Sequence, residues 1–183
     1  MSKVLVYSER VPLAAELLTA AAAIAGGEPV TAACIDDPSA AEELAALGAD
    51  EIILATGATP CQPPIKGLDR ANVMEAIEYL RGTKQTGQRV AVVGGGLTGC
   101  EIAYDLVLKG KKPVIIEMMD DLLKVKYLCA SNSNMLRDLI RYHHIPVELN
   151  AKVTEITDQG VKIDSLTGVR NIPCDSVVMS VGY

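Results

Sequence analysis

Residues 90–117 read VAVVGGGLTGCEIAYDLVLKGKKPVIIE, and this stretch decides the fold. Four apolar or small residues, 90–93, lead into the glycine-rich segment 94–99, after which Ile102, Ala103 and Leu106 recur at helical spacing. A second short apolar run then ends at Glu117. The order predicts a buried strand, a tight glycine turn, a helix packed on the sheet and a second parallel strand.

The glycine segment satisfies the spacing G-x-G-x-x-G, and each glycine has a physical task. Gly94 permits the sharp turn from strand to helix, Gly96 lets a diphosphate approach the backbone, and Gly99 lets the helix pack closely on the sheet. The free amides and partial positive charge at the helix N-terminus then attract the diphosphate. The candidate cofactor-binding residues of this segment are Gly94, Gly95, Gly96, Leu97, Thr98 and Gly99.

Glu117 completes the dinucleotide pattern because a carboxylate after the second strand accepts hydrogen bonds from the ribose hydroxyls. The segment 118–121, Met-Met-Asp-Asp, supplies no arginine for a 2′-phosphate, so NAD(H) is favoured over its phosphorylated form. The alternative is a glycine-rich turn with no ligand. The strand, helix and acidic residue around the glycines make that alternative the weaker interpretation.

The composition narrows the classes of function. The formal net charge is −6 and no basic stripe is present, which argues against nucleic acid and acidic membrane surfaces as partners. Hydrophobic residues make up 49% of the chain without any Phe or Trp, which favours an α/β core. No metal site and no catalytic side chain is predicted. The five cysteines form no CxxC pair and indicate a reducing, cytoplasmic setting: Cys34, Cys61, Cys100, Cys129 and Cys174.

The apolar periodicity predicts two units, 1–55 and 69–183, joined by a Pro- and Gly-rich linker at 56–68. The first unit is expected to be β-α-β-α-β. In the second, Asn72 and Glu75 suggest a capping box for a helix that runs to about Arg81. The fold class is therefore α/β, with Rossmann-like, doubly wound parallel sheets in two units and a small antiparallel meander in the second. The remaining expected strands are 3–7, 30–35, 51–55, 89–93, 113–117 and 176–181, and the helices include 97–109 and 132–143.

Four segments carry a family resemblance. They are ILATGATPCQPPIKG (53–67), VAVVGGGLTGCEIAYDL (90–106), VIIEMMDDLL (114–123) and DSVVMSVGY (175–183). Together they resemble the NAD(P)H-binding part of FAD-dependent pyridine nucleotide oxidoreductases, most closely 2-enoate reductases and dienoyl-CoA reductases.

The resemblance implies two further features of the site. It places Glu101 near the nicotinamide end of the cofactor. It also makes Thr56-Gly57 and Val181-Gly182 the two crossings between the NAD and FAD domains, which adds Gly182 to the candidate cofactor-binding residues.

The amino-terminal segment departs from that family. Its members carry a separate G-x-G-x-x-G for FAD before the Ala-Thr-Gly crossing, whereas here MSKVLVYSERVPLAAELLTAAAAIAGG occupies that place. FAD is therefore expected only if the missing flavin domain is supplied. Residues 3–54 resemble, more weakly, the amino-terminal domain of electron-transfer flavoprotein α subunits. This combination suggests a recombined, engineered or excised chain, with a natural fusion as the alternative.

Three functions remain open from the sequence. The first is an NADH-binding module that positions nicotinamide for hydride transfer to a flavin. The second is a non-catalytic assembly or electron-transfer-associated domain that docks a flavoprotein partner, or a second copy of itself, through an exposed apolar surface. The third is a recombined or engineered chain that retains the fold without activity.

Overall fold

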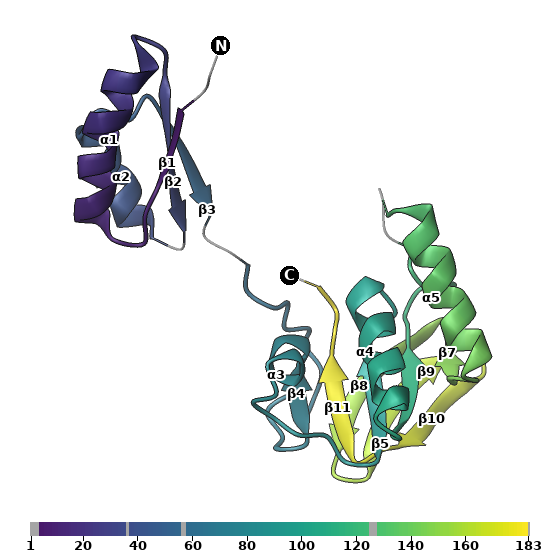
Figure 1. Ribbon diagram of the computed structural model, residues 1–183. Helices are drawn as coiled ribbons and strands as arrows, with labels where there is room; N and C mark the ends of the chain where they lie inside the picture. Colours follow the sequence, from purple (N-terminus) through teal and green to yellow (C-terminus); the bar gives the residue numbers. More distant parts are fainter. Residues whose placement is uncertain (1–3, 36, 56–57, 125–127, 183) are drawn as a thin grey trace. The chain divides into compact units, whose positions relative to one another are not determined.

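The computed structural model describes residues 4–35, 37–55, 58–124 and 128–182. The chain divides into two compact units, Met1–Thr59 and Pro60–Tyr183. Each unit has its own hydrophobic core, and Figure 1 shows the elements of each.

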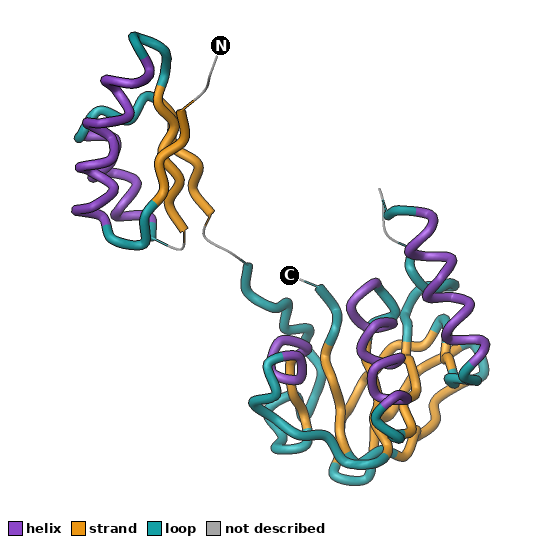
Figure 2. Tube along the Cα trace, viewed as in Figure 1, coloured by secondary structure: helices purple, strands orange, loops and turns teal. Residues whose placement is uncertain are grey.

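The first unit is a three-stranded parallel sheet with two helices on one face (Figure 2). An αL glycine, Gly26, ends the first helix, and Asp37 begins the second by accepting a hydrogen bond from the Ala40 amide at 3.1 Å. The elements in chain order are β1 (Val4–Tyr7), α1 (Val11–Ala25), β2 (Val30–Ile35), α2 (Pro38–Ala46) and β3 (Glu51–Ala55).

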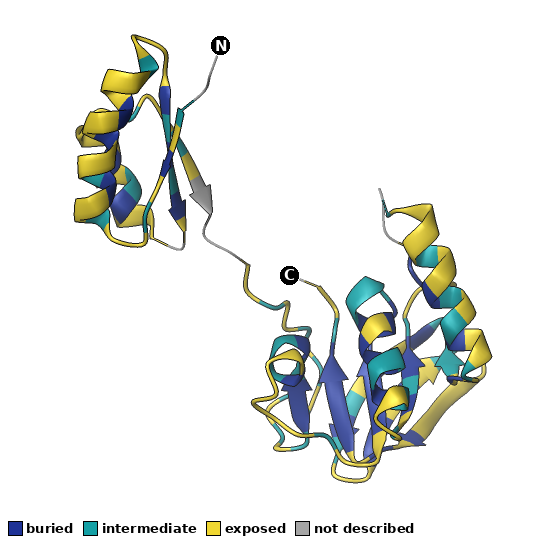
Figure 3. Ribbon diagram, in the orientation of Figure 1, coloured by how far each residue is buried: buried dark blue, intermediate teal, exposed yellow. Residues whose placement is uncertain are grey.

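The two faces of this first sheet differ in burial. Side chains alternate along each strand, so Val6, Val30 and Ala32 pack under the helices. The intervening residues point to the other face, where no helix of the described part of this unit lies (Figure 3). Exposed apolar side chains on that face are Leu5, Tyr7, Ile35 and Ile53.

The second unit has a five-stranded parallel sheet between two layers (Figure 1). Strand alternation builds both cores: Val90 and Val92 face the helices, while Ala91 and Val93 face a three-stranded antiparallel sheet. In spatial order the parallel strands are β4 (Val73–Glu75), β11 (Ser176–Met179), β5 (Arg89–Val93), β6 (Lys112–Ile116) and β7 (Val147–Glu148). The helices are α3 (Ala76–Leu80), α4 (Leu97–Leu108) and α5 (Ala130–Tyr142), and the antiparallel strands are β8 (Ala151–Thr157), β9 (Gly160–Ser165) and β10 (Gly168–Pro173).

The predicted fold class is confirmed: parallel sheets with Rossmann-like β-α-β order, plus a small antiparallel sheet. Most element ends lie within one or two residues of the expected bounds, but one helix begins elsewhere. The capping box at Asn72 and Glu75 does not form, because the Asn72 side-chain amide donates to the Thr157 carbonyl at 3.0 Å and the chain continues as β4. The helix begins one turn later, at Ala76, with a capping box between Glu75 and Glu78.

Residues 60–68, which the sequence places in a linker, belong to the second unit. Ile65 and Leu68 pack against the core between the parallel and antiparallel sheets. Lys66 forms a β-bridge with Glu155, and their side chains pair at 2.8 Å. This segment is therefore held in place beside the carboxyl ends of the parallel strands.

Candidate functional site

The glycine turn between β5 and α4 is built by close backbone contacts. Gly94 has a φ of +107°, a conformation that L side chains rarely adopt, and a Cβ there would lie 2.2 Å from the Ser180 carbonyl oxygen. A Cβ at Gly99 would lie 1.9 Å from the Gly94 carbonyl oxygen. Both glycines therefore allow the start of α4 to pack directly on the sheet.

Gly96 differs from these two glycines because its missing side chain leaves open space. Apart from Gly96 itself and its two neighbours in the chain, no protein atom lies within 4 Å of the position that a Cβ would take. The residue has an ordinary extended backbone, with φ −73° and ψ −170°. Nothing in the fold of the described residues requires a glycine here. The open space lies at the N-terminus of α4, where the first turn of amides has no intrahelical partner.

Glu117 follows β6 and bends back toward the glycine turn. Its Oε2 accepts from the Gly95 amide at 2.5 Å, and its Oε1 accepts from the Met119 amide at 2.7 Å. A carboxylate offers about four acceptor positions, so two remain for a ligand. The two backbone amides fix the orientation of this carboxylate beside the turn.

A cavity of about 710 Å³ opens at the carboxyl ends of β5, β6 and β11. Its size is within the range of small-molecule and cofactor sites, and this edge of a parallel sheet is where α/β folds bind ligands. All of the lining residues belong to the second unit. The sequence-predicted residues among them are Gly94, Gly95, Gly96, Leu97, Thr98, Glu117 and Gly182.

Glu101 is exposed on α4 and is not among the described residues that line the cavity. Its assignment to the nicotinamide end remains a prediction of the resemblance. Of the two expected crossings, Thr56-Gly57 falls outside the described residues. Val181-Gly182 lines the cavity, and the Gly182 carbonyl accepts from the Cys61 amide at 2.9 Å.

The sequence reasoning missed the lining residues that come from distant segments. Pro60, Pro63 and Ile65 form one wall, and residues 151–154 of β8 form another. No local periodicity marks these positions as belonging to a site. One sequence signal was available for the first wall. Three prolines and a cysteine cluster directly after the Ala-Thr-Gly segment.

The thiol behind the turn is not a nucleophile. Cys100 is fully buried, and burial raises the pKa of its thiol to about 12. It therefore packs as a small apolar residue. Among the described residues no cluster of His, Cys, Asp and Glu is arranged to hold a metal ion, and none of the described helices is long and apolar enough to span a bilayer.

The parallel sheet, the glycine turn and the cavity at the strand ends define the second unit as a Rossmann-like domain. The chain belongs to the pyridine nucleotide-disulphide oxidoreductase family, whose model matches residues 16–183. That match begins inside α1 of the first unit.

Several known proteins resemble the chain. It is 38% identical over 143 residues to a cinnamate reductase of Clostridium sporogenes, covering 78% of this chain and 21% of the relative. It is 36% identical over 147 residues to an NADH oxidase of Thermoanaerobacter brockii, covering 78% and 22%. The chain thus spans about a fifth of the length of these curated relatives.

The solved structures agree on the fold. A 2-naphthoyl-CoA reductase complex matches with a TM-score of 0.68 and 22% identity, covering 98% of this chain and 33% of the other. A thioredoxin reductase of T. acidophilum matches with a TM-score of 0.58 and 29% identity, covering 73% and 44%. FAD and NAD(H) are the cofactors of this oxidoreductase family, which is consistent with NAD(H) here and with FAD where a flavin-binding part is supplied.

Proposed function

We propose that the second unit is an NADH-binding module, with the diphosphate over Gly96 at the start of α4. The observation that carries this proposal is the open space at Gly96, which the fold does not need and which a Cβ would fill. Glu117 lies beside it in the same cavity and holds the adenosine ribose. Gly182 and Cys61, which line the same cavity, would then contact the nicotinamide end of a bound cofactor.

The residues of this chain bind and orient the cofactor. The amides of the first turn of α4 donate to the diphosphate, and the helix dipole adds favourable charge. The free acceptor positions of Glu117 accept from the two ribose hydroxyls. The apolar wall of Pro60, Pro63 and Ile65 excludes water from the other end of the cavity. Bound NADH supplies a hydride to a flavin, and no side chain of this chain is assigned a catalytic role.

The whole protein's reaction is proposed from its relatives. The cinnamate reductase likeness suggests an enoate reductase-like flavoprotein in which FAD sits in a domain outside this chain. The first unit would then be the electron-transfer-flavoprotein-like part, a proposal that rests on the sequence pattern of residues 3–54. The five cysteines, all free, favour a reducing cytoplasm for this protein.

A second candidate function has one observation in its favour. The first unit exposes Leu5, Tyr7, Ile35 and Ile53 on one sheet face, whereas all-parallel sheets are usually covered on both faces. We take a second copy of the chain as the partner that would cover this face, because light scattering detects such self-association directly. Self-association that a Tyr7→Lys variant abolishes would support an assembly role, and a monomer at high concentration would contradict it.

Calorimetric titration of the full chain with NADH, NADPH and FAD tests the first proposal. We expect NADH to bind more tightly than NADPH, and a Glu117→Arg variant to weaken or reverse that preference. FAD should give no heat. If none of the three nucleotides binds, the proposed function is overturned. If FAD binds stoichiometrically, the assignment of the flavin to another domain is overturned.

A further inference from the structure

The segment after Glu117 lines part of the cavity and contains a cation. Lys124 lines the cavity together with Glu117, Met118, Met119 and Asp121. A lysine at the ribose end is unexpected in a site that favours the unphosphorylated cofactor, because an ammonium group there would attract a 2′-phosphate.

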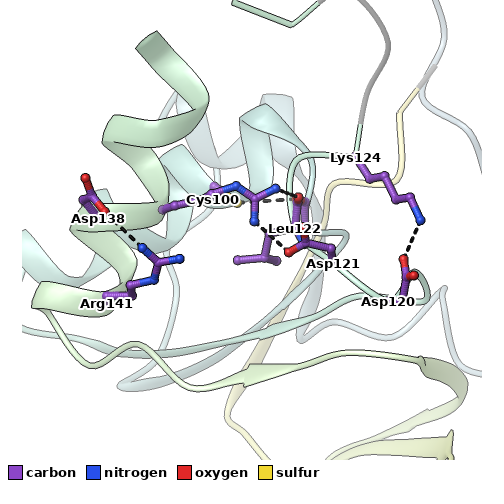
Figure 4. Close-up of polar contacts among 9 residues, drawn as sticks. Cys100, Asp120, Asp121, Leu122, Lys124, Asp138 and Arg141 are labelled. Atoms are coloured by element: carbon purple, nitrogen blue, oxygen red, sulfur yellow. Dashed lines mark hydrogen bonds and ion pairs between the residues drawn. The ribbon is translucent and has the colours of Figure 1, made fainter. Parts of the chain in front are cut away.

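Lys124 is instead paired with an aspartate. Its Nζ lies 2.6 Å from Oδ1 of Asp120, one helical turn's spacing earlier in the chain (Figure 4). Asp120 does not itself line the cavity, but its ion-pair partner Lys124 does. Both side chains are largely exposed, so either can rearrange without disturbing a core.

A second cation is paired in the same way with the neighbouring aspartate. Arg137 of α5 places Nη1 2.6 Å from Oδ1 of Asp121, and its Nη2 donates to the Leu122 carbonyl at 2.5 Å. The two consecutive aspartates, Asp120 and Asp121, therefore each hold one cation, in different directions (Figure 4).

We propose that Asp120 is a positioning residue for cofactor selectivity, which restrains Lys124 and so disfavours a 2′-phosphate. This inference rests on the proposed NADH site and deepens it. A 2′-phosphate carries nearly two negative charges and needs cationic donors. To donate to it, Lys124 would have to leave Asp120 and expose an unpaired carboxylate close to the phosphate.

The size of the effect follows from the exposure of the pair. An exposed ion pair contributes little to stability, and water and salt screen it strongly. Asp120 therefore changes selectivity several-fold, whereas the carboxylate of Glu117, fixed by two amides beside the turn, provides the larger part. The contribution of Asp120 is expected to diminish as the salt concentration rises.

The test compares the dissociation constants of NADH and NADPH for the full chain and for variants, at low and high salt. In Asp120→Asn the ratio of the NADPH constant to the NADH constant should fall roughly three- to tenfold at low salt. Asp120→Glu retains the charge and should keep the wild-type ratio. In the double variant Asp120→Asn with Lys124→Ala, the ratio of the NADPH constant to the NADH constant should return toward the wild-type value, because the freed lysine is absent.

The matched control is Asp138→Asn, which removes a carboxylate paired at 3.2 Å with Arg141 on α5 (Figure 4). Neither residue lines the cavity. An equal change of the ratio in Asp120→Asn and Asp138→Asn would overturn the inference and leave the NADH site intact. A wild-type chain that binds neither nucleotide would instead overturn the proposed function.

Discussion

Gly99 packs so closely on Gly94 that a methyl group at Gly99 would come within 1.9 Å of the Gly94 carbonyl oxygen. Backbone atoms form this contact, so no side chain can move aside. Gly99→Ala must therefore shift the start of α4 away from the sheet. We expect a loss of at least about 2 kcal/mol in the free energy of unfolding. Urea denaturation followed by circular dichroism measures this loss. An unchanged denaturation midpoint would contradict the close contact between Gly99 and Gly94.

Tyr79 joins α3 to α4 through a hydrogen bond to Asp105, which also pairs with Lys109 at 2.6 Å. The Tyr79 ring is largely buried. Tyr79→Phe keeps the ring and removes the hydroxyl, so we expect a loss of about 1 kcal/mol in stability. Tyr142→Phe is the control, because Tyr142 is 77% exposed. Equal urea denaturation midpoints for the wild type and Tyr79→Phe would show that this hydrogen bond adds nothing to the free energy of unfolding.

Asp175 makes the stability of the second unit sensitive to acid. Hydrogen bonds from the Arg89 side chain and amide, at 2.7 and 2.8 Å, hold the pKa of this carboxyl below its ordinary value. A depressed folded-state pKa gives stability that is present above the unfolded value, near 3.9, and is lost as the pH falls through the folded value.

The melting temperature of Asp175→Asn should therefore be lower than that of the wild type at pH 7, and the difference should shrink toward pH 3. Thermal scans at several pH values measure this. Asp138→Asn, at an exposed pair on α5, should stay within error of the wild type throughout. A difference that grows as the solution is acidified would contradict the assigned direction.

The cysteines should react in an order set by burial and hydrogen bonding. Burial raises the thiol pKa of Cys100 to about 12 and of Cys174 to about 11. Cys129 is exposed, and the amides of Asn132 and Ser131 lower its pKa. At pH 8 iodoacetamide should label Cys129 quickly and leave the two buried thiols unmodified until the chain is denatured. Peptide mass spectrometry reads this order, and early labelling of Cys100 would refute the burial.

The central strand-turn-helix-strand stretch could be predicted from sequence because its signals are local. Apolar alternation, three glycines at fixed spacing and a carboxylate after the second strand all lie within 90–117. The helix expected from Asn72 was displaced because that side chain bonds to Thr157, far away in the sequence. Such tertiary competition has no local signature.

The cavity was only partly predictable for the same reason. Its glycine floor and Glu117 come from one continuous motif, whereas residues 60–65 and 151–154 reach it through the arrangement of the sheet layers. The pair of Asp120 and Lys124 is not predictable either, because a four-residue spacing alone does not show that the lysine faces a cavity. Placing these walls requires the packed structure.

The most direct test of the account is a calorimetric titration of Gly96→Ala with NADH beside the wild type. The added methyl meets no atom within 4 Å beyond its neighbours in the chain and suits the extended backbone, so the melting temperature should be unchanged. The methyl would occupy the space assigned to the diphosphate, so the account predicts NADH affinity at least roughly tenfold weaker than in the wild type. Equal affinity in the two proteins would contradict the placement of the cofactor over Gly96.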